Sequence, residues 1–238
     1  MHLIDYSLPT PEENLAFDEA LLERCTQDQI PRLRFWEPPG VFVVLGYANR
    51  AATEVDLGAC RARGIPVLRR ISGGGTVLQA PGVLNYTLTF PISQHGPMAT
   101  ITGTNRHILE RHGEALSRLL DRPVERRGQT DLALEGRKVS GNAQKRAGRA
   151  LLFHGTFLLA LPFDLLDPLL PMPSRQPDYR ADRTHRAFLE NLPLEPQAVK
   201  GALATLWQAT PQIHSVERDE IDRLLKRRYA NPAWNFRR

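Results

Sequence analysis

Residues 69–77 read Arg-Arg-Ile-Ser-Gly-Gly-Gly-Thr-Val, and a strand-like run over 67–70 leads directly into the glycines. Three consecutive glycines are costly in chain entropy, so a loop carries them where backbone must approach something closely. Their N–H groups can converge on one anion, and Arg70 beside them can offer a phosphate a bidentate pair of donors. The alternative is a tight turn flanked by solvated arginines. The stretch is not a Walker loop, since no Gly-Lys-Ser or Gly-Lys-Thr follows, and its contiguous glycines do not match the dinucleotide fingerprint.

Strand and helix signals surround this loop. Strand-like runs lie at 33–36, 41–45 and 84–90, and the last alternates so that Leu84, Tyr86, Leu88 and Phe90 should face a core. Thr10 and Glu13 have the spacing of a capping box, with Pro11 suited to the first helical position, which predicts a helix to about Cys25. A second helix is predicted over about 105–120 from its apolar stripe.

The second half of the chain predicts a hairpin and then a more helical region. Runs at 132–134 and 138–140 flank a turn at Glu135-Gly136, and a long apolar stretch follows at 150–161. After Pro171 the sequence changes to helical segments, including 197–208 and 215–229. This order predicts an α+β fold with a mixed, mainly antiparallel sheet and packed helices. We expect one domain over 1–238, strand-rich over about 1–170 and helical over about 171–238.

Two further stretches carry side chains suited to chemistry. Lys138 alternates with Val139 on a predicted strand, so one of the two faces away from the core, and a lysine fixed in a cleft can stabilise negative charge on a phosphate or acyl oxygen. Asp131 could hold a magnesium ion or a substrate hydroxyl. His154-Gly155-Thr156 interrupts an apolar strand, which suggests a pocket wall where Gly155 allows close ligand approach. The alternatives are an exposed lysine in a hairpin and a satisfied core histidine.

Composition and charge exclude several classes of protein. The 238 residues carry a formal net charge of +5, and 42% of them are hydrophobic, which is typical of a globular protein. Two cysteines exclude a disulfide scaffold, and the N-terminus lacks the layout of a signal peptide, so we expect a cytoplasmic protein without a membrane partner. Aromatic residues make up only 7% and are not interleaved with basic ones, which argues against a nucleic-acid partner.

Basic residues concentrate in one segment of the chain. The segment from Arg122 to Arg149 contains eight basic residues and three acidic residues, Glu125, Asp131 and Glu135. Its formal net charge is therefore 8 − 3 = +5. An electropositive rim there would attract a nucleotide and steer an acidic protein partner. The alternative is a solvated face, which is the usual explanation of a run of charges.

The ordered set of motifs resembles the lipoate–protein ligases. It comprises residues 69–77, Asn85, Asp131, residues 136–141 and 154–156, with residues 14–19, 33–36, Tyr229 and 234–235 fitting the same family at the two ends. The resemblance implies the biotin/lipoate ligase catalytic fold, akin to class II aminoacyl-tRNA synthetase cores. It also implies two reactions: lipoate and ATP give lipoyl-adenylate and pyrophosphate, and a lysine of a lipoyl domain or of glycine-cleavage H protein then accepts the acyl group.

The resemblance also implies a role for each matching residue. The nucleotide and adenylate contacts would be Arg70, the backbone at Gly75, Thr76, Val77 and Leu78, and Asp131, with Asp131 near the phosphates as a ligand of Mg²⁺. Lys138 would touch both the acyl carbonyl and the phosphate and would act electrostatically rather than as a general base. The substrate-binding residues would be Ser72, Gly73, Gly74, Asn85, Ser140, Gly141, His154, Gly155 and Thr156.

Two departures from the family pattern matter. Longer ligases carry a C-terminal accessory domain of about ninety residues, the size of a small domain, which has no counterpart here, so a separate accessory protein could supply its role. The segment 175–186 contains four arginines and is predicted either to close over phosphates or to be a solvated loop. Acceptor protein, preference for lipoate or octanoate, and oligomeric state stay open.

Rival functions remain on sequence alone. An octanoyltransferase would share the fold but move an acyl group without ATP through a nucleophilic cysteine. Cys25 lies in the first predicted helix and Cys60 in a predicted helix before the Gly-rich stretch, away from where the cysteines of such relatives fall. We therefore expect both to pack as small apolar residues. A biotin ligase is disfavoured by the absence of a Gly-Arg-Gly-Arg type loop, and a basic nucleic-acid-binding module lacks any recognisable motif.

Overall fold

A computed structural model describes residues 1–212 and 218–237 as helices, strands and connecting loops. The strands are β1 (His2–Asp5), β2 (Arg32–Trp36), β3 (Phe42–Leu45), β4 (Val67–Arg69), β5 (Val77–Gln79), β6 (Val83–Pro91), β7 (Val124–Arg127), β8 (Asp131–Leu134), β9 (Arg137–Ala147), β10 (Ala150–Leu158) and β11 (Thr210–Pro211). The α-helices are α1 (Pro11–Asp28), α2 (Ala51–Glu54), α3 (Leu57–Ala62), α4 (Ile101–Leu120), α5 (Leu166–Leu169), α6 (His185–Phe188), α7 (Pro196–Leu206), α8 (Arg218–Leu224) and α9 (Pro232–Asn235). Short 3₁₀ turns (Phe163–Leu165, Asp178–Arg180) and a π-helical turn (Leu225–Tyr229) complete the elements.

The strands form two sheets. The larger has the order β11-β1-β2-β6-β10-β9-β8-β7, and the smaller has the order β4-β3-β5. Strand β1 pairs in parallel with β2 and β11, and β3 pairs in parallel with β4, whereas all the other neighbours among the described strands run antiparallel. The predicted fold class, a mixed and mainly antiparallel sheet with packed helices, is confirmed.

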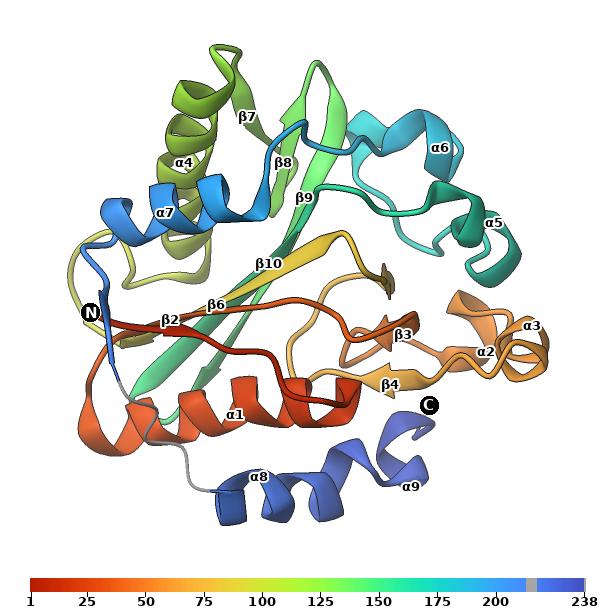
Figure 1. Cartoon of the computed structure of the whole chain (residues 1–238), viewed down its shortest axis with the longest axis horizontal. Helices are drawn as coiled ribbons and strands as arrows, with labels where there is room; N and C mark the ends of the chain where they lie inside the picture. Colours follow the sequence, from red (N-terminus) through yellow and green to blue (C-terminus); the bar gives the residue numbers. More distant parts are fainter. Residues whose placement is uncertain (213–217, 238) are drawn as a thin grey trace.

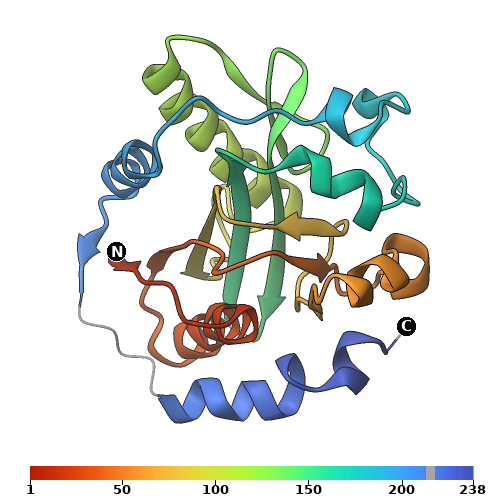
Figure 2. The same ribbon diagram turned by 45° about the vertical axis from the view of Figure 1, so that its right-hand side comes forward.

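Helices cover both faces of the larger sheet. Helices α4 and α7 lie on one face, and α1 lies on the other with α8 running alongside it, while α9 lies next to β4 (Figure 1). Figure 2 shows the same arrangement from the side. Strand β6 is therefore buried along nearly its whole length. The predicted core positions Leu84, Tyr86, Leu88 and Phe90 all belong to the cluster under α4 and α7, and Thr87 and Thr89 on the opposite face are buried as well.

Helix α1 begins where the sequence predicts. Thr10 accepts a hydrogen bond from the Glu13 backbone N–H, and the Glu13 carboxylate accepts one from the Thr10 N–H, so the capping box is complete. The helix continues beyond the expected end at Cys25 to Asp28, with Gln29 closing it in the left-handed conformation. Its buried face supplies Phe17, Leu21 and Cys25 to the second core cluster.

The smaller sheet forms a separate lobe beside the larger one. It packs with α2, α3 and α5 around a third apolar cluster that also includes Val83 and Leu158 of the larger sheet (Figure 1). The Gly-rich stretch connects β4 to β5. The loop is therefore held between two strands of the small sheet, at the side that faces the larger sheet.

The predicted hairpin is strands β8 and β9. Glu135 and Gly136 both have positive φ (49° and 75°), as a two-residue type I′ turn requires. Asp131 pairs with Gly141 and Ala133 with Lys138, and this register shift marks a β-bulge between them. Strand β9 extends to Ala147, well beyond the expected run at 138–140, because β10 pairs along its second half.

Other boundaries differ modestly from the predictions. The helix expected over 105–120 begins at Ile101, since Thr100 caps it, and the helix expected over 197–208 is α7. Of the helix expected over 215–229, residues 215–217 lie outside the described part of the chain, and the rest forms α8 and the π-helical turn. Ile221, Leu224 and Tyr229 pack with α1 in one cluster. A single domain over 1–238 stays a prediction.

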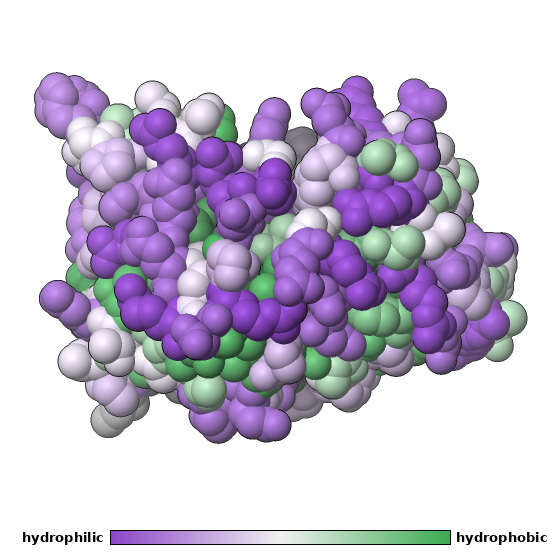
Figure 3. Space-filling model, turned by 90° about the horizontal axis from the view of Figure 1, so that it is seen from above, coloured by the Kyte–Doolittle hydropathy of each residue, from purple (hydrophilic) through white to green (hydrophobic). Residues whose placement is uncertain are grey.

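The surface is mostly polar. The face seen from above in Figure 3 is largely hydrophilic, with apolar surface in scattered patches. The large exposed apolar side chains are spread over the chain rather than gathered in one element: Tyr6, Tyr47, Ile101, Leu119, Met172 and Phe236. None of the described helices combines the length and the apolar character that crossing a membrane would need.

Candidate active site

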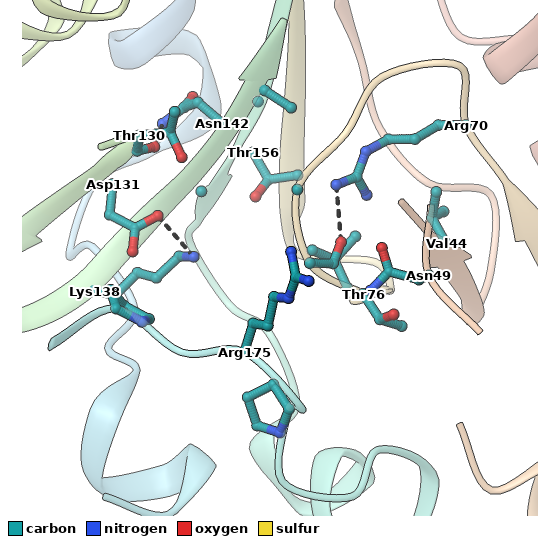
Figure 4. Close-up of a pocket in the computed structure, with 18 of the residues that line it drawn as sticks. Val44, Asn49, Arg70, Thr76, Thr130, Asp131, Lys138, Asn142, Thr156 and Arg175 are labelled. Atoms are coloured by element: carbon teal, nitrogen blue, oxygen red, sulfur yellow. Dashed lines mark hydrogen bonds and ion pairs between the residues drawn. The ribbon is translucent and has the colours of Figure 1, made fainter. Parts of the chain in front are cut away.

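A cavity of about 1170 Å³ opens between the two sheets. Its walls come from the Gly-rich loop, from β6, β9 and β10, from the loop at 127–131, and from residues 173–180, which we call the strap (Figure 4). Its volume is slightly above the range of about 300–1,000 Å³ that is usual for small-molecule sites.

The cavity brings together most of the residues singled out from the sequence. The predicted residues that line it are Arg70, Gly74, Gly75, Thr76, Val77, Asn85, Asp131, Lys138, Gly141, His154, Gly155 and Thr156. Ser72, Gly73, Leu78 and Ser140 are not among its lining residues. The Leu78 side chain packs in the apolar cluster of the small sheet and its strand pairs with β3, so a nucleotide contact of its backbone stays a prediction. Ser72 and Ser140 are fully buried beneath the cavity walls.

Arg70 organises the Gly-rich loop. Its Nη2 donates to the carbonyl oxygens of Gly73 (2.7 Å) and Gly75 (2.8 Å), and its Nε lies 3.1 Å from the Ser72 hydroxyl. Burial lowers the pKa of Arg70 to about 10, which still leaves it charged at neutral pH. Much of the guanidinium fork expected to bind phosphate is therefore used to hold the loop. The charge stays beside the cavity, where it can act on an anion.

Gly74 is the glycine that this loop requires. Its φ is +87°, and a Cβ placed there would lie 2.9 Å from Arg70 Nη2. Gly46 is needed for the same packing, since a Cβ on it would lie 2.1 Å from the Gly74 carbonyl oxygen. Gly73 and Gly75 have no positive φ, and a Cβ on either would meet nothing within 4 Å. The triple glycine therefore contains one position with a strict conformational requirement.

A buried polar chain supports the loop from below. The Ser72 hydroxyl lies 2.5 Å from His154 Nε2, and His154 Nδ1 lies 3.7 Å from an Asp18 carboxylate oxygen. Asp18 also pairs with Arg34 at 2.6 Å. Burial lowers the pKa of His154, although Asp18 opposes the shift, so the ring is neutral at neutral pH. Ser72 does not line the cavity. This series of buried polar side chains therefore positions the loop and the His154 ring and does not present a nucleophile.

Lys138 faces Asp131 across the bulge of the hairpin. Its Nζ lies 2.9 Å from Asp131 Oδ1, while Val139 is fully buried, so the predicted alternation is confirmed. Because the bulge adds a residue, Lys138 lies on the same face as Gly141, whose Cβ would come within 2.8 Å of Lys138 Nζ and Cε. Tyr179 of the strap donates its hydroxyl to the other Asp131 oxygen (2.8 Å). Burial raises the pKa of Tyr179, and Asp131 raises it further, so the phenol keeps its proton.

Polar side chains from several strands form the floor of the cavity, and Gln79 and Asn142 among them were not singled out from the sequence. The Asn142 Oδ1 accepts from the Tyr86 hydroxyl (2.6 Å), and Asn85 exchanges two hydrogen bonds with Gln79. A Cβ on Gly155 would lie 1.8 Å from Asn142 Oδ1. Gly155 therefore makes room for the Asn142 side chain, and since it also lines the cavity, its role in ligand approach stays a prediction. Nothing local in the sequence pairs these residues, because they come from different strands.

The acidic residues offer one candidate for a metal ion. Among the described residues there is no group of three or more His, Cys, Asp or Glu side chains that could hold a metal. Mg²⁺ is commonly bound through one or two carboxylates together with substrate phosphates, and Asp131 is a carboxylate at the cavity wall. Both of its oxygens are engaged by Lys138 and Tyr179, so a metal ion would share or displace one of these contacts.

Both cysteines lie away from the cavity. Cys25 on α1 and Cys60 on α3 are buried, and neither lines the cavity. Burial raises the pKa of each thiol, which disfavours the reactive thiolate. The expectation that they pack as small apolar residues is confirmed, since each belongs to an apolar cluster.

The basic segment is largely paired with neighbouring groups. Arg122, Arg127 and Arg137 make ion pairs with Glu135, Glu125 and Glu190 respectively. Arg146 donates to the carbonyl oxygens of Met98 and Ala99. Of this segment, only Arg127 and Lys138 supply cationic side chains to the cavity. Most basic side chains of this segment thus belong to a paired, solvated face. Fewer of them reach the cavity than the predicted electropositive rim implied.

Comparisons with known proteins agree on one family. The lipoyl protein ligase A/B catalytic domain matches residues 10–195. The chain is 31% identical to a protein of Aeropyrum pernix assigned as a lipoate-protein ligase A, over 84% of this chain and 72% of that one. It is 30% identical to octanoyltransferase LipM of Kyrpidia tusciae, over 94% of each chain.

Solved structures show the same fold. A lipoate-protein ligase A bound with ATP superposes with a TM-score of 0.82 at 25% identity, over 99% of this chain and 98% of that one. The bi-partite lipoate protein ligase of Thermoplasma acidophilum superposes with a TM-score of 0.84 at 24% identity, over 99% of this chain and 95% of that one. The resemblance read from residues 69–77, 136–141 and 154–156 is thereby confirmed, and this chain belongs to the lipoyl protein ligase A/B catalytic-domain family.

Proposed function

We propose that this chain is an ATP-dependent lipoate–protein ligase. It activates lipoate or octanoate as an acyl-adenylate and transfers the acyl group to a lysine of a lipoyl domain or of glycine-cleavage H protein. The observation that carries the proposal is the content of the cavity: it contains Lys138 and the Gly-rich loop, whereas both cysteines lie elsewhere. An adenylate stores the activated acyl group as a mixed anhydride, and this chemistry needs no thiol.

The first reaction is a displacement at phosphorus. A carboxylate oxygen of the fatty acid attacks the α-phosphate of ATP, the new P–O bond forms, and the bond to the pyrophosphate oxygen breaks. Two anions must approach each other, so fixed positive charge and N–H donors lower the barrier. Lys138 supplies such a charge without transferring a proton, and the loop around Gly74, Gly75 and Thr76 supplies donors. Charged Arg70 lies directly behind that loop.

The acyl chain has a matching wall. Leu15, Trp36 and Val44 line one part of the cavity, next to the neutral His154 ring. An aliphatic chain would be buried there, while its carboxylate would reach toward Lys138. Asn85 and Thr156 provide polar groups in the same cavity. Roles for Ser72, Gly73 and Ser140 would be indirect, through the backbone that holds the lining residues.

Asp131 is the residue that would hold Mg²⁺. When bound, the ion would neutralise phosphate charge beside Lys138. What the chain itself provides is a carboxylate that keeps Lys138 extended across Gly141. A cytoplasmic location remains our expectation.

The second reaction transfers the acyl group to an amine. The acceptor lysine nitrogen attacks the acyl carbonyl, the amide bond forms, and AMP leaves with the electrons of the C–O bond. The similar protein of Thermoplasma acidophilum belongs to a lipoylation system that comprises a bi-partite lipoate protein ligase and its E2 lipoyl domain. This supports lipoyl domains as acceptors and leaves room for a separate accessory protein.

An octanoyltransferase is the second candidate, because the similarity to LipM extends over nearly the whole chain. Transfer from a thioester requires the acyl group to be held on an enzyme nucleophile between two acceptors. The cysteines that could do so are buried in apolar clusters, and the Ser72 hydroxyl is buried below the loop. The ligase is therefore the reading that this cavity supports better.

The deciding experiment pairs two acyl donors with a variant that lacks both thiols. The wild type and the Cys25→Ser, Cys60→Ser variant are each given an apo lipoyl domain as acceptor. The acyl donor is either lipoate with ATP or octanoyl carrier protein without ATP. We expect ATP-dependent lipoylation that both proteins perform equally at equal folded concentration. ATP–pyrophosphate exchange with lipoate, octanoate and biotin identifies the acid used in the first step. Transfer from octanoyl carrier protein without ATP that the double variant loses would overturn the ligase assignment.

A further inference from the structure

The strap carries a cationic side chain whose charge nothing in the described chain neutralises. Six cationic residues line the cavity: Arg50, Arg70, Arg127, Lys138, Arg175 and Arg180. Arg70 is hydrogen-bonded to the Gly-rich loop, Lys138 pairs with Asp131, and Arg127 pairs with Glu125. The Arg180 Nε donates to the Arg183 carbonyl oxygen, and its guanidinium stacks on Phe188. Within the described residues, the Arg50 and Arg175 side chains make no hydrogen bond or ion pair.

Of these two, Arg175 reaches the centre of the cavity. Figure 4 shows its guanidinium pointing inward from the strap, between Lys138 on one side and Thr76 of the Gly-rich loop on the other. The Thr76 hydroxyl is buried and has no hydrogen-bond partner among the described residues. The guanidinium donors of Arg175 lie beside the Gly-rich loop that contains Thr76, although the strap and the loop are far apart in sequence.

The strap is held at both ends across the cavity. The Ser174 hydroxyl donates to the carboxylate of Glu54, a buried residue of α2. At the other end, Tyr179 donates to Asp131 of β8. Arg175 follows directly after the first of these anchors, so its backbone is placed by the contact with Glu54. The strap thus connects the lobe of the small sheet with the hairpin of the large sheet.

We propose that Arg175 binds the β- and γ-phosphates of the nucleotide and then the pyrophosphate that leaves. The proposal rests on the ATP-dependent function above. An adenylate carries a single phosphate charge, which Lys138 and the Gly-rich loop can match, whereas a triphosphate carries several more. One lysine cannot balance the several charges of a triphosphate, so a second cation is needed, and arginine matches phosphate geometry with two parallel donors. This assigns one of the four arginines of segment 175–186 to the phosphates.

The other arginines of that segment differ from Arg175 in their surroundings. Arg183 donates to the carbonyl oxygens of Gly136 and Tyr179. Arg186 is exposed, pairs with Asp164 at 2.7 Å and does not line the cavity. Arg186→Gln therefore removes an arginine from the same segment without touching the cavity, and it is the matched control.

Binding measurements separate this role from a structural one. Calorimetry with a non-hydrolysable ATP analogue, inorganic pyrophosphate and AMP is compared for the wild type, Arg175→Gln, Arg175→Lys and Arg186→Gln. Because a charge-assisted contact is lost, Arg175→Gln should bind the ATP analogue and pyrophosphate about 10- to 100-fold more weakly than the wild type. AMP binding should be unchanged, Arg175→Lys should recover part of the loss, and Arg186→Gln should match the wild type.

The possible failures are distinguishable. If Arg175→Gln weakens the binding of AMP as much as that of the ATP analogue, Arg175 only supports the strap. If pyrophosphate binding is unchanged, Arg175 makes no phosphate contact. Either result overturns the inference while leaving the ligase function intact. If the wild type binds neither the ATP analogue nor pyrophosphate but transfers octanoate from its carrier protein, the proposed function itself fails, and the role of Arg175 fails with it.

Discussion

The two walls of the cavity reach their geometry by different means. The loop wall, residues 70–76, is built from backbone: Arg70 is hydrogen-bonded to the carbonyl oxygens of Gly73 and Gly75, and Gly74 adopts a φ that side chains rarely allow. The lysine wall, strands β8 and β9, is built from side chains: Lys138 lies across Gly141 to reach Asp131, which Tyr179 also contacts.

This difference indicates how each wall can act on a ligand. The loop wall is fixed in one conformation. Moving it would break several buried hydrogen bonds and change the solvent exposure of the Arg70 charge. The lysine wall can exchange partners, because the flexible Lys138 side chain can leave Asp131 for a phosphate at little cost to the fold. We therefore expect changes in the loop wall to affect stability and activity together, and changes in the lysine wall to affect activity alone.

Lys138→Ala should have the largest effect on activity. Losing a preorganised charge of this kind typically lowers the rate about 10²–10³-fold, and adenylate formation should fall by at least this factor. ATP–pyrophosphate exchange with lipoate measures the loss, and thermal unfolding should show a folded protein. Lys145→Ala is the control, since Lys145 lies on the same strand but does not line the cavity. Exchange near the wild-type rate in Lys138→Ala would place the chemistry elsewhere.

Gly74→Ala, a change in the loop wall, should lower both stability and ligand binding. A residue forced into a left-handed conformation costs about 1–2 kcal/mol, and the new Cβ would also press on Arg70. We expect a lower Tm together with weaker binding of a non-hydrolysable lipoyl-adenylate analogue. The matched variant is Gly73→Ala, whose Cβ meets nothing within 4 Å and whose backbone has no positive φ. If both variants behave alike, the loop is an ordinary turn and the contrast between the walls disappears.

Gly141→Ala should give the smallest structural effect and a selective loss of activity. The new Cβ would lie 2.8 Å from Lys138 Nζ and Cε, which can move aside because they end a flexible side chain. Stability should therefore change by less than about 0.5 kcal/mol, as at sites without a special packing role, while adenylate formation falls. A double-mutant cycle tests the cause: added to Lys138→Ala, the Gly141→Ala change should have no further effect on the rate. An additional loss in that background would mean that Gly141 acts independently of Lys138.

Much of the site could be predicted from local sequence because its signals are local. The capping box at Thr10, the alternation in 84–90 and the turn at Glu135-Gly136 each depend on residues within one element, and the structure confirms them. The Gly-rich stretch likewise predicted a loop, and the structure places Gly74 and Gly75 at the cavity wall, while anion binding there stays a prediction. Asp18 was missed, because its place below His154 comes from the packing of α1 against β10.

The surroundings of two other residues have the same physical origin. The space beside Gly155, which lines the cavity, holds the Asn142 side chain of the neighbouring strand. Leu78 follows the loop in sequence, yet its alternation on β5 turns its side chain into the core of the small sheet. In each case the pairing of strands from distant parts of the chain decides which group a residue meets, and no local pattern reports that pairing.

The sequence by itself determined the family, the positions of most strands and helices, and the residue types available for chemistry, because periodicity, capping and glycine placement act over a few residues. Only the tertiary structure decided which charges are free. It paired Lys138 with Asp131, used Arg70 to hold its own loop, buried both cysteines away from the cavity and left Arg175 unpaired at its centre. Electrostatic interactions depend on distance and burial, and these are set when the two sheets and the strap come together.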